Sequence, residues 1–229
     1  GRDGVVLVWS LGHGGGSAAK RGAHRAAEVV ATIPVFEAVE GLAVLPPDAR
    51  FPGRSKKVLK GGGFYVVTAG EKGVLRVWEH PSGKCVHTEQ CPAALSGALW
   101  NPVDRTLVAW TFDHTVLLHA PADFSVAKRF IGSFDEITGL KLVGDDQRQL
   151  AVSTNTDHIQ LLELESRDST LLEGHTDIVL TLATTPDGLL LVSGSKDNTA
   201  RVWQANGGEG WSCVAVARGH AGNVTAVVA

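Results

Sequence analysis

The chain has 229 residues, of which 44% are hydrophobic, and its 21 Lys and Arg against 24 Asp and Glu give a formal net charge of −3. This composition excludes a disordered chain, and the near-neutral charge gives no global attraction to nucleic acid or to a membrane surface. No apolar run approaches the roughly 18 residues of a membrane-spanning helix, and the opening GRDGVVLVWS resembles a turn and a strand rather than a secretory signal.

Short apolar and β-branched runs follow one another along the chain and predict strands. In chain order, the clearest are FYVVTAG (64–70), TLVAWTF (106–112), QLAVSTN (149–155) and LLLVSGS (189–195). Turn-forming stretches such as NPVD, VGDD and TPDG lie between them. No segment keeps a helical period over a dozen residues, so the sequence predicts an all-β fold.

A motif of nearly constant length recurs along the chain. Its equivalent positions are residues 9, 78, 119, 163 and 203, at or near the ends of GRDGVVLVW, AGEKGVLRVW, FDHTVLLHA, TDHIQLLEL and SKDNTARVW. The last three steps are 41, 44 and 40 residues, and the first is 69, which leaves room for an inserted loop. A period of this size is typical of a β-propeller with four-stranded blades.

The most complete copy is GHTDIVLTLATTPDGLLLVSGSKDNTARVW, residues 174–203. Its Gly-His, Pro-Asp-Gly turn, Ser-x-x-x-Asp and Arg-Val-Trp resemble a blade of the WD-repeat family. That resemblance implies a buried hydrogen-bonded tetrad, in which a carboxylate fixes an imidazole that meets a hydroxyl and then an indole N–H. The structural tetrad maps onto His175, Ser193, Asp197 and Trp203. Partial tetrads map onto Asp3, Trp9, Thr68, Trp78, Asp113, Ser153 and Asp157.

The repeat divides the chain into blades. Residues 1–36 are expected to hold the last two strands of a first blade with an inserted basic loop. Whole blades are expected over 37–91, 92–134, 135–174 and 175–219, and 220–229 should start a further blade with NVTAVVA as its first strand. The chain has no methionine and begins and ends within a blade, so we expect a piece of a longer protein. It would be an incomplete propeller or the junction of two tandem propellers.

Three stretches resemble a narrower group within this family. ATIPVFEAVEGLAVLPPD (31–48), VVTAGEKGVLRVWEHPSGKCVHTE (66–89) and LLEGHTDIVLTL (171–182) are similar to the transducin-β-like subunit of the small-subunit processome. The resemblance implies a non-catalytic interaction scaffold in the nucleus and nucleolus, acting in pre-ribosomal RNA processing and small-subunit biogenesis. Its implied partners are other processome proteins and, directly or indirectly, a small nucleolar ribonucleoprotein and pre-ribosomal RNA. No cofactor, metal, membrane or small-molecule substrate is implied.

Two other functions remain open. The chain could be a different WD-repeat adaptor, such as a ubiquitin-ligase receptor or a signalling β-subunit. A propeller enzyme is the second alternative, and such an enzyme converges polar or metal-binding side chains on the central channel. The sequence shows no carboxylate or histidine recurring once per blade at one position, and it lacks a G-x-S-x-G nucleophile elbow. The Ser, His and Asp of the tetrad are therefore interpreted as structural rather than hydrolytic.

Two glycine-rich segments hold eight of the 21 basic residues and no acidic residue. The first (11–25) lies between the third and fourth strands of one blade, and the second (49–63) lies between the first and second strands of the next. In an antiparallel blade these connections emerge at the same edge, so we hypothesise one basic patch that meets RNA phosphate or an acidic partner. The alternative is two solvated, flexible insertions. The candidate residues are Lys20, Arg21, Arg25, Arg50, Arg54, Lys56, Lys57 and Lys60.

The remaining polar and aromatic residues give no functional signal. The three cysteines, Cys85, Cys91 and Cys213, match no zinc spacing and are too few for a disulfide framework, so we expect small buried side chains in a reducing compartment. Trp100 and Trp110 are expected to belong to the core, and the alternative is an exposed pair that contacts a partner. The scattered histidines, His80, His87, His114, His119 and His158, sit at no metal-binding spacing.

Overall fold

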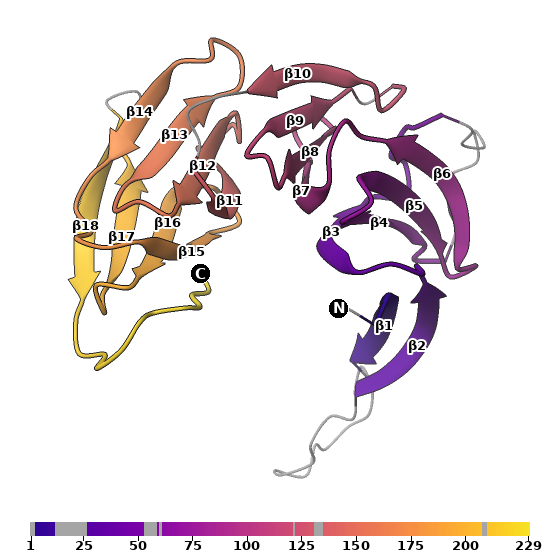
Figure 1. Ribbon diagram of the computed structural model, residues 1–229, viewed down its shortest axis with the longest axis horizontal. Helices are drawn as coiled ribbons and strands as arrows, with labels where there is room; N and C mark the ends of the chain where they lie inside the picture. The colour runs from indigo at the N-terminus through magenta and orange to yellow at the C-terminus, as the bar shows by residue number, and fades with distance from the viewer. Residues whose placement is uncertain are drawn as a thin grey trace. The chain divides into compact units, whose positions relative to one another are not determined.

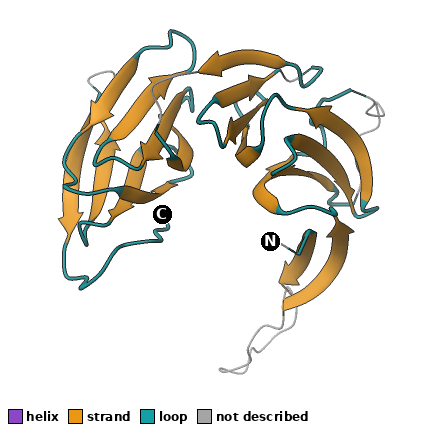
Figure 2. Cartoon of the chain, viewed as in Figure 1, coloured by secondary structure: helices purple, strands orange, loops and turns teal. Residues whose placement is uncertain are grey.

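The computed structural model describes residues 3–11, 27–52, 59, 61–120, 122–130, 135–207 and 210–229. Over these residues the regular structure consists of strands β1 to β18, joined by turns and loops (Figure 2). The all-β fold predicted from the sequence is confirmed. No helix in this part of the chain is long and apolar enough to cross a membrane.

Four sheets each contain four strands that neighbour one another in chain order (Figure 1). The first holds β3 (Val39–Leu45), β4 (Phe64–Gly70), β5 (Val74–His80) and β6 (Lys84–Gln90). The second holds β7 (Leu95–Asn101), β8 (Thr106–Thr111), β9 (Val116–His119) and β10 (Val126–Phe130). The third holds β11 (Ile137–Val143), β12 (Gln149–Thr154), β13 (Ile159–Glu163) and β14 (Ser169–Leu172). The fourth holds β15 (Val179–Thr184), β16 (Leu190–Ser195), β17 (Ala200–Ala205) and β18 (Trp211–Ala217).

The strands that the sequence predicts are the second strands of these sheets. The runs at 64–70, 106–112, 149–155 and 189–195 correspond to β4, β8, β12 and β16. Second strands are flanked on both sides, and in β4 every residue after Phe64 is buried. Residues buried on both faces of a strand form a continuous apolar run, which explains why these strands are the easiest to recognise.

Register shifts recur at two equivalent places. In the pairs β1–β2, β5–β6 and β17–β18 the shift falls at a tryptophan of the first strand, which is Trp9, Trp78 or Trp203. In β3–β4, β11–β12 and β15–β16 it falls within the first three residues of the first strand. A bulge bends its strand and redirects its side chains. The backbone therefore repeats even where the side chains of the motif differ.

The chain forms two compact units, each with its own core. Unit 1 comprises Gly1–Trp100, Arg105–Thr111 and Leu117–Lys128, and unit 2 comprises Asn101–Asp104, Phe112–Val116 and Arg129–Ala229. Tyr65, Leu75 and Phe124 are among the fully buried side chains of the unit 1 core. In unit 2, Leu191 and Trp203 lie in a core built from the strands of the third and fourth sheets.

A two-stranded sheet begins the chain. It consists of β1 (Val5–Leu11) and β2 (Ala27–Pro34), paired antiparallel. Its Val6 and Ile33 pack on Val66 and Trp78 of the next sheet. Trp9 on its other face is 54% exposed. The pair matches the third and fourth strands that the sequence predicts for a first blade.

Residues 218–229 form no strand, so the strand predicted for NVTAVVA is not observed. A first strand gains its ladder hydrogen bonds from a second strand, and the described residues offer none to this segment. Instead, the Val224 N–H donates to the Ser195 carbonyl at 3.0 Å, and the Val224 side chain is buried. A Cβ on Gly194 would lie 2.7 Å from Val224 Cγ1, so the absence of a side chain at Gly194 makes room for Val224.

Candidate functional site: the polar core of the sheets

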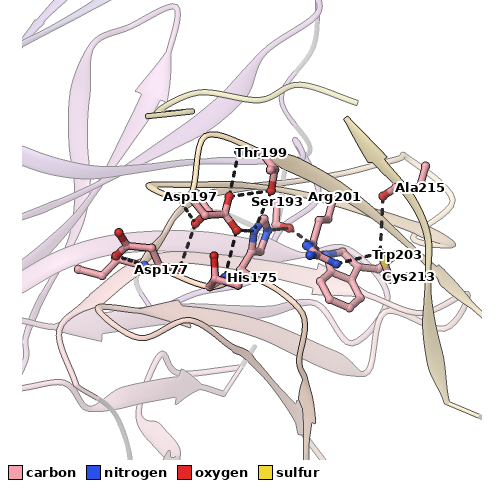
Figure 3. A network of polar contacts seen from close by, with 12 residues as sticks. His175, Asp177, Ser193, Asp197, Thr199, Arg201, Trp203, Cys213 and Ala215 are labelled. Carbon is pink, nitrogen blue, oxygen red and sulfur yellow. Dashed lines mark hydrogen bonds and ion pairs between the residues drawn. The ribbon is translucent and has the colours of Figure 1, made fainter. Parts of the chain in front are cut away.

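The most complete polar network lies in the sheet β15–β18 (Figure 3). His175 precedes β15, Ser193 lies on β16, Asp197 lies in the following turn and Trp203 lies on β17. Nδ1 of His175 is 2.7 Å from Oδ2 of Asp197, and Nε2 is 2.8 Å from Oγ of Ser193. The Trp203 indole N–H donates to the same Oγ at 2.9 Å. One chain of hydrogen bonds thus joins β16, β17 and the segment before β15.

The donors and acceptors of this network fix its protons. An indole N–H can only donate, so the Ser193 oxygen accepts from Trp203, and the ionised carboxylate of Asp197 can only accept, so Nε2 of the neutral His175 is left to accept the Ser193 hydroxyl proton. Nδ1 then carries the imidazole proton and donates it to Asp197. Burial lowers the pKa of His175 and outweighs the opposing effect of the Asp197 hydrogen bond and charge, so the imidazole is neutral at pH 7.

Asp197 accepts most of the hydrogen bonds. Its Oδ1 accepts the Thr199 N–H at 2.8 Å and the Thr199 hydroxyl at 2.6 Å, and its Oδ2 also accepts the Thr176 N–H at 3.1 Å. Burial raises the pKa of Asp197, but the hydrogen bonds from Thr199, His175 and Thr176 outweigh burial and hold the pKa well below its usual range. The carboxylate therefore stays ionised and fixes a turn in which Asn198 has a left-handed φ of 65°.

Although it contains Ser, His and Asp, this network is not arranged to attack a substrate. Ser193 is fully buried, and its hydroxyl is engaged by both Trp203 and His175. A nucleophilic serine needs an open approach to its oxygen and donors for the developing oxyanion. The geometry instead satisfies buried polar groups and ties strands together.

The sheet β3–β6 keeps half of this network. The Trp78 indole N–H donates to Oγ1 of Thr68 at 3.0 Å, as Trp203 does to Ser193. Val35, 3% exposed, precedes the first strand at the place that His175 takes in the fourth sheet. Lys72, in the turn position of Asp197, is exposed.

A different ion pair completes the polar core of that sheet. The Arg76 guanidinium contacts the carboxylate of Glu37, whose side chain is only 4% exposed. A Cβ on Gly70 would lie 2.4 Å from the Ala38 carbonyl oxygen and 3.2 Å from the Glu37 carboxylate, so a glycine there leaves room for the backbone that carries the buried acid. Sequence reasoning missed this pair, because Glu37 lies outside the recurring motif and the arginine of that motif has no assigned partner in it. The only available signal was the unusual Glu in PVFE.

The sheet β7–β10 has other residue types at two positions of the network. Ala109 occupies the serine position, and His119, fully buried, occupies the tryptophan position. Ala109 offers no hydroxyl, and His119 bonds through Nδ1 to the Phe124 carbonyl at 2.7 Å, so it supports the loop after β9. Asp113 is exposed. Burial lowers the pKa of His119 and outweighs the opposing effect of the Phe124 hydrogen bond.

In the sheet β11–β14 the two motif residues are separated. Ser153 is fully buried, and its Oγ lies 2.9 Å from Oγ1 of Thr138. Asp157 is exposed and lies 3.3 Å from Nδ1 of the adjacent His158. Glu163 stands where a tryptophan would donate to the serine. Asp157 therefore fixes its own turn and not a buried imidazole.

In the sheet β1–β2, Asp3 and Trp9 are both exposed. Oδ1 of Asp3 accepts the Val5 N–H at 3.4 Å and stays within its own turn.

Most of the basic candidate residues lie outside the described residues. Arg50 is described and exposed. The structure does not describe the segments that contain the other seven, which are Lys20, Arg21, Arg25, Arg54, Lys56, Lys57 and Lys60. The strand bounds place the first segment between β1 and β2 and the second between β3 and β4.

The cysteines depart in part from their predicted burial. Cys91 is buried, but Cys85 and Cys213 are exposed, because they lie on β6 and β18, the last strands of their sheets. Burial raises the pKa of the Cys91 thiol to about 12. Among the described residues, no group of three or more His, Cys, Asp or Glu side chains is placed to hold a metal ion.

The comparison with known families agrees with this geometry. The WD domain, G-beta repeat model matches residues 166–204, the segment that contains the whole His175 network. The chain belongs to the WD-repeat family. Its four four-stranded sheets are the blades of a WD-repeat propeller, with a partial blade at the start of the chain.

Several curated proteins are similar to the chain. Transducin beta-like protein 3 of Homo sapiens is 31% identical over 231 residues, which cover 99% of this chain and 26% of the relative. U3 small nucleolar RNA-associated protein 13 of Saccharomyces cerevisiae is 24% identical over 248 residues, which cover 99% of this chain and 28% of the relative. Ribosome biogenesis protein ERB1 of Debaryomyces hansenii is 47% identical over 38 residues, 17% of this chain and 5% of the relative. The chain thus spans about a quarter of the length of the first two relatives. Together these names point to WD-repeat proteins of ribosome biogenesis.

Proposed function

We propose that the chain is part of a non-catalytic protein-interaction scaffold of the nucleolar small-subunit processome. It would act in pre-ribosomal RNA processing and small-subunit biogenesis. The observation that carries this proposal is similarity over 99% of the chain to transducin beta-like protein 3 and to a yeast protein named for its association with U3 small nucleolar RNA. The proposed location is the nucleus and nucleolus.

The polar core of the blades supports a scaffold role. In the fourth sheet, the side chains that could do acid–base or nucleophilic chemistry bond one another in the interior. In the first sheet the buried Glu37 is paired with Arg76. Such networks stabilise the blade and leave the connecting loops free to vary and to contact partners. The proposed partners are other processome proteins and, directly or indirectly, the small nucleolar ribonucleoprotein and pre-ribosomal RNA.

Co-purification from cells tests this role. The full-length protein carrying an affinity tag is expected to recover U3 small nucleolar RNA and to sediment in a gradient with large pre-ribosomal particles. An unrelated tagged WD-repeat adaptor serves as the control. Sedimentation only as free protein, with U3 RNA at the level of the control, would contradict the proposal.

We also propose that the two basic segments bind RNA phosphate or an acidic partner. Three Lys→Glu changes at Lys56, Lys57 and Lys60 are expected to weaken recovery of pre-ribosomal RNA and to flatten its salt dependence. Each lost contact to single-stranded RNA should remove about 0.7 from the slope of log affinity against log salt. Reversal of the exposed lysines Lys84, Lys141 and Lys196 changes the net charge equally and is the control. Equal recovery by the two variants would contradict the patch.

A further inference from the structure

We propose that Phe36 is a preorganised aromatic anchor that inserts into an apolar pocket of a protein partner. This inference rests on the proposed scaffold function and names the kind of partner that this part of the chain would hold. Phe36 is 82% exposed, which is well above the 54% of Trp9 and the 50% of Phe112. It lies in the loop between β2 and β3.

The backbone of Phe36 is strained, and its ring adds little to the buried surface of the fold. Its φ is 62°, a left-handed conformation that bulky residues rarely adopt. Phe124 has a similar φ of 59°, but its ring is fully buried among aromatic side chains of the core. Burial of the ring offsets the strain at Phe124, whereas the ring of Phe36 remains in water. Strain that packing does not explain is a feature of binding sites.

The loop holds Phe36 in place from both sides. The Gly4 carbonyl accepts the Val35 N–H at 2.8 Å and the Phe36 N–H at 3.2 Å. Val35 is buried in an apolar cluster, and Glu37 is held by its ion pair with Arg76. The aromatic ring is thus presented from a fixed backbone, which lowers the entropy lost when a partner binds. Aromatic side chains are enriched at protein–protein interfaces, where an anchor fills a pocket of the partner.

The charges around Phe36 favour a protein over RNA as the partner. β1 and β2 pair Val5 with Pro34, and β3 and β4 pair Val39 with Gly70, so the loop shares one end of these sheets with the turn after Gly70. Among the residues that the structure describes, the exposed charged ones at this end are Asp3, Glu40, Glu71 and Lys72. The net negative charge of these four side chains repels a phosphate backbone. They complement a pocket with a basic rim.

Site-specific photo-crosslinking tests the anchor. A photoreactive phenylalanine analogue at position 36 of the full-length protein in cells is expected to give a single protein adduct. Its crosslinked peptide should be apolar with flanking Lys or Arg. The same analogue at Leu171, an apolar residue that is 50% exposed on β14, is the control position. An adduct with RNA, or a yield at position 36 no greater than at Leu171, would overturn the proposal.

A matched variant separates binding from folding. Phe36→Gly relieves the positive φ, so thermal unfolding of the full-length protein should stay at or above that of the wild type. Recovery of the partner identified by crosslinking should fall at least about 10-fold, whereas Leu171→Ala should leave it unchanged. Full recovery by Phe36→Gly would contradict the anchor. U3 RNA recovery by the wild-type protein is scored separately, so the proposed function and the anchor can fail independently.

Discussion

Replacement of Asp197 by alanine measures how much the tetrad stabilises its blade. The side chain accepts four hydrogen bonds, from His175 Nδ1, the Thr176 N–H, and the N–H and hydroxyl of Thr199. The Thr176 N–H can turn to water, but the other donors are largely buried. A buried donor without an acceptor costs about 1–3 kcal/mol, and neighbouring losses overlap. We expect Asp197→Ala to lower the free energy of opening of the blade by about 3–5 kcal/mol.

Asp197→Asn is the matched control. Its carbonyl oxygen can still accept from Thr199, and its amide can donate to Nδ1 if His175 takes its other tautomer. The Ser193 hydroxyl then accepts from Nε2–H, so we expect a loss of only about 1–2 kcal/mol. Hydrogen exchange of the amides in 190–205 of the full-length protein reports the opening free energy, with those in 64–80 as the internal reference. Unchanged protection of 190–205 in Asp197→Ala would refute the reasoning.

Three further predictions concern other parts of the chain. Glu37→Ala should destabilise the first whole blade by about 2–3 kcal/mol, measured by hydrogen exchange of the 64–80 amides. This is less than the loss for a fully buried pair, because Arg76 keeps 22% exposure. Unchanged exchange would mean that the ion pair does not stabilise the blade. Gly97→Ala should lower the free energy of chemical unfolding by about 1–3 kcal/mol, because the new Cβ would lie 1.9 Å from the Trp110 ring. Adding Trp110→Ala to this variant should recover part of the lost stability. Additive losses for the two changes would argue against the clash. When the native protein is alkylated and the labelled sites are mapped by mass spectrometry, Cys91 should stay unlabelled whereas the two exposed thiols react. Equal labelling of all three cysteines would show that Cys91 is accessible.

The pH dependence of the fourth blade has a definite sign. The pKa of His175 is lowered by burial, so the unfolded state takes up a proton at a higher pH than the folded state. Stability is therefore complete above the unfolded pKa of about 6.5 and falls as the pH drops below it, by at most about 1.4 kcal/mol per pH unit. The pKa of Asp197 is also lowered, so its contribution is present above about pH 4 and is lost below it. Exchange of the 190–205 amides between pH 7 and 5 measures the first effect, and a flat profile would contradict it.

The sequence predicted the fold well because the repeat depends on spacing. The side chains of Ser193 and Trp203 are hydrogen-bonded across β16 and β17, and His175 can reach Ser193 only if the loop and strand lengths between them are kept. These lengths are visible in the sequence as fixed separations. The second strands were equally visible because burial on both faces gives them an uninterrupted apolar run.

The polar cores of the other blades could not be predicted in the same way. Asp157 and Asp197 are the same residue type at equivalent positions, yet one is exposed and the other buried, because the imidazole beside Asp197 is buried whereas that of His158 beside Asp157 is partly exposed. The pair of Glu37 and Arg76 joins the loop before β3 to β5, and this contact is a three-dimensional property that no spacing reveals. Phe36 was missed for a related reason, since neither its φ nor its exposure is written in the residue type.

Depletion of the full-length protein from cells tests the proposed scaffold role most directly. The expected result is accumulation of uncleaved pre-ribosomal RNA and loss of small ribosomal subunits, with large subunits maintained, and rescue by the wild-type protein. Normal pre-ribosomal RNA cleavage and an unchanged level of small subunits after complete depletion would contradict a role in the small-subunit processome.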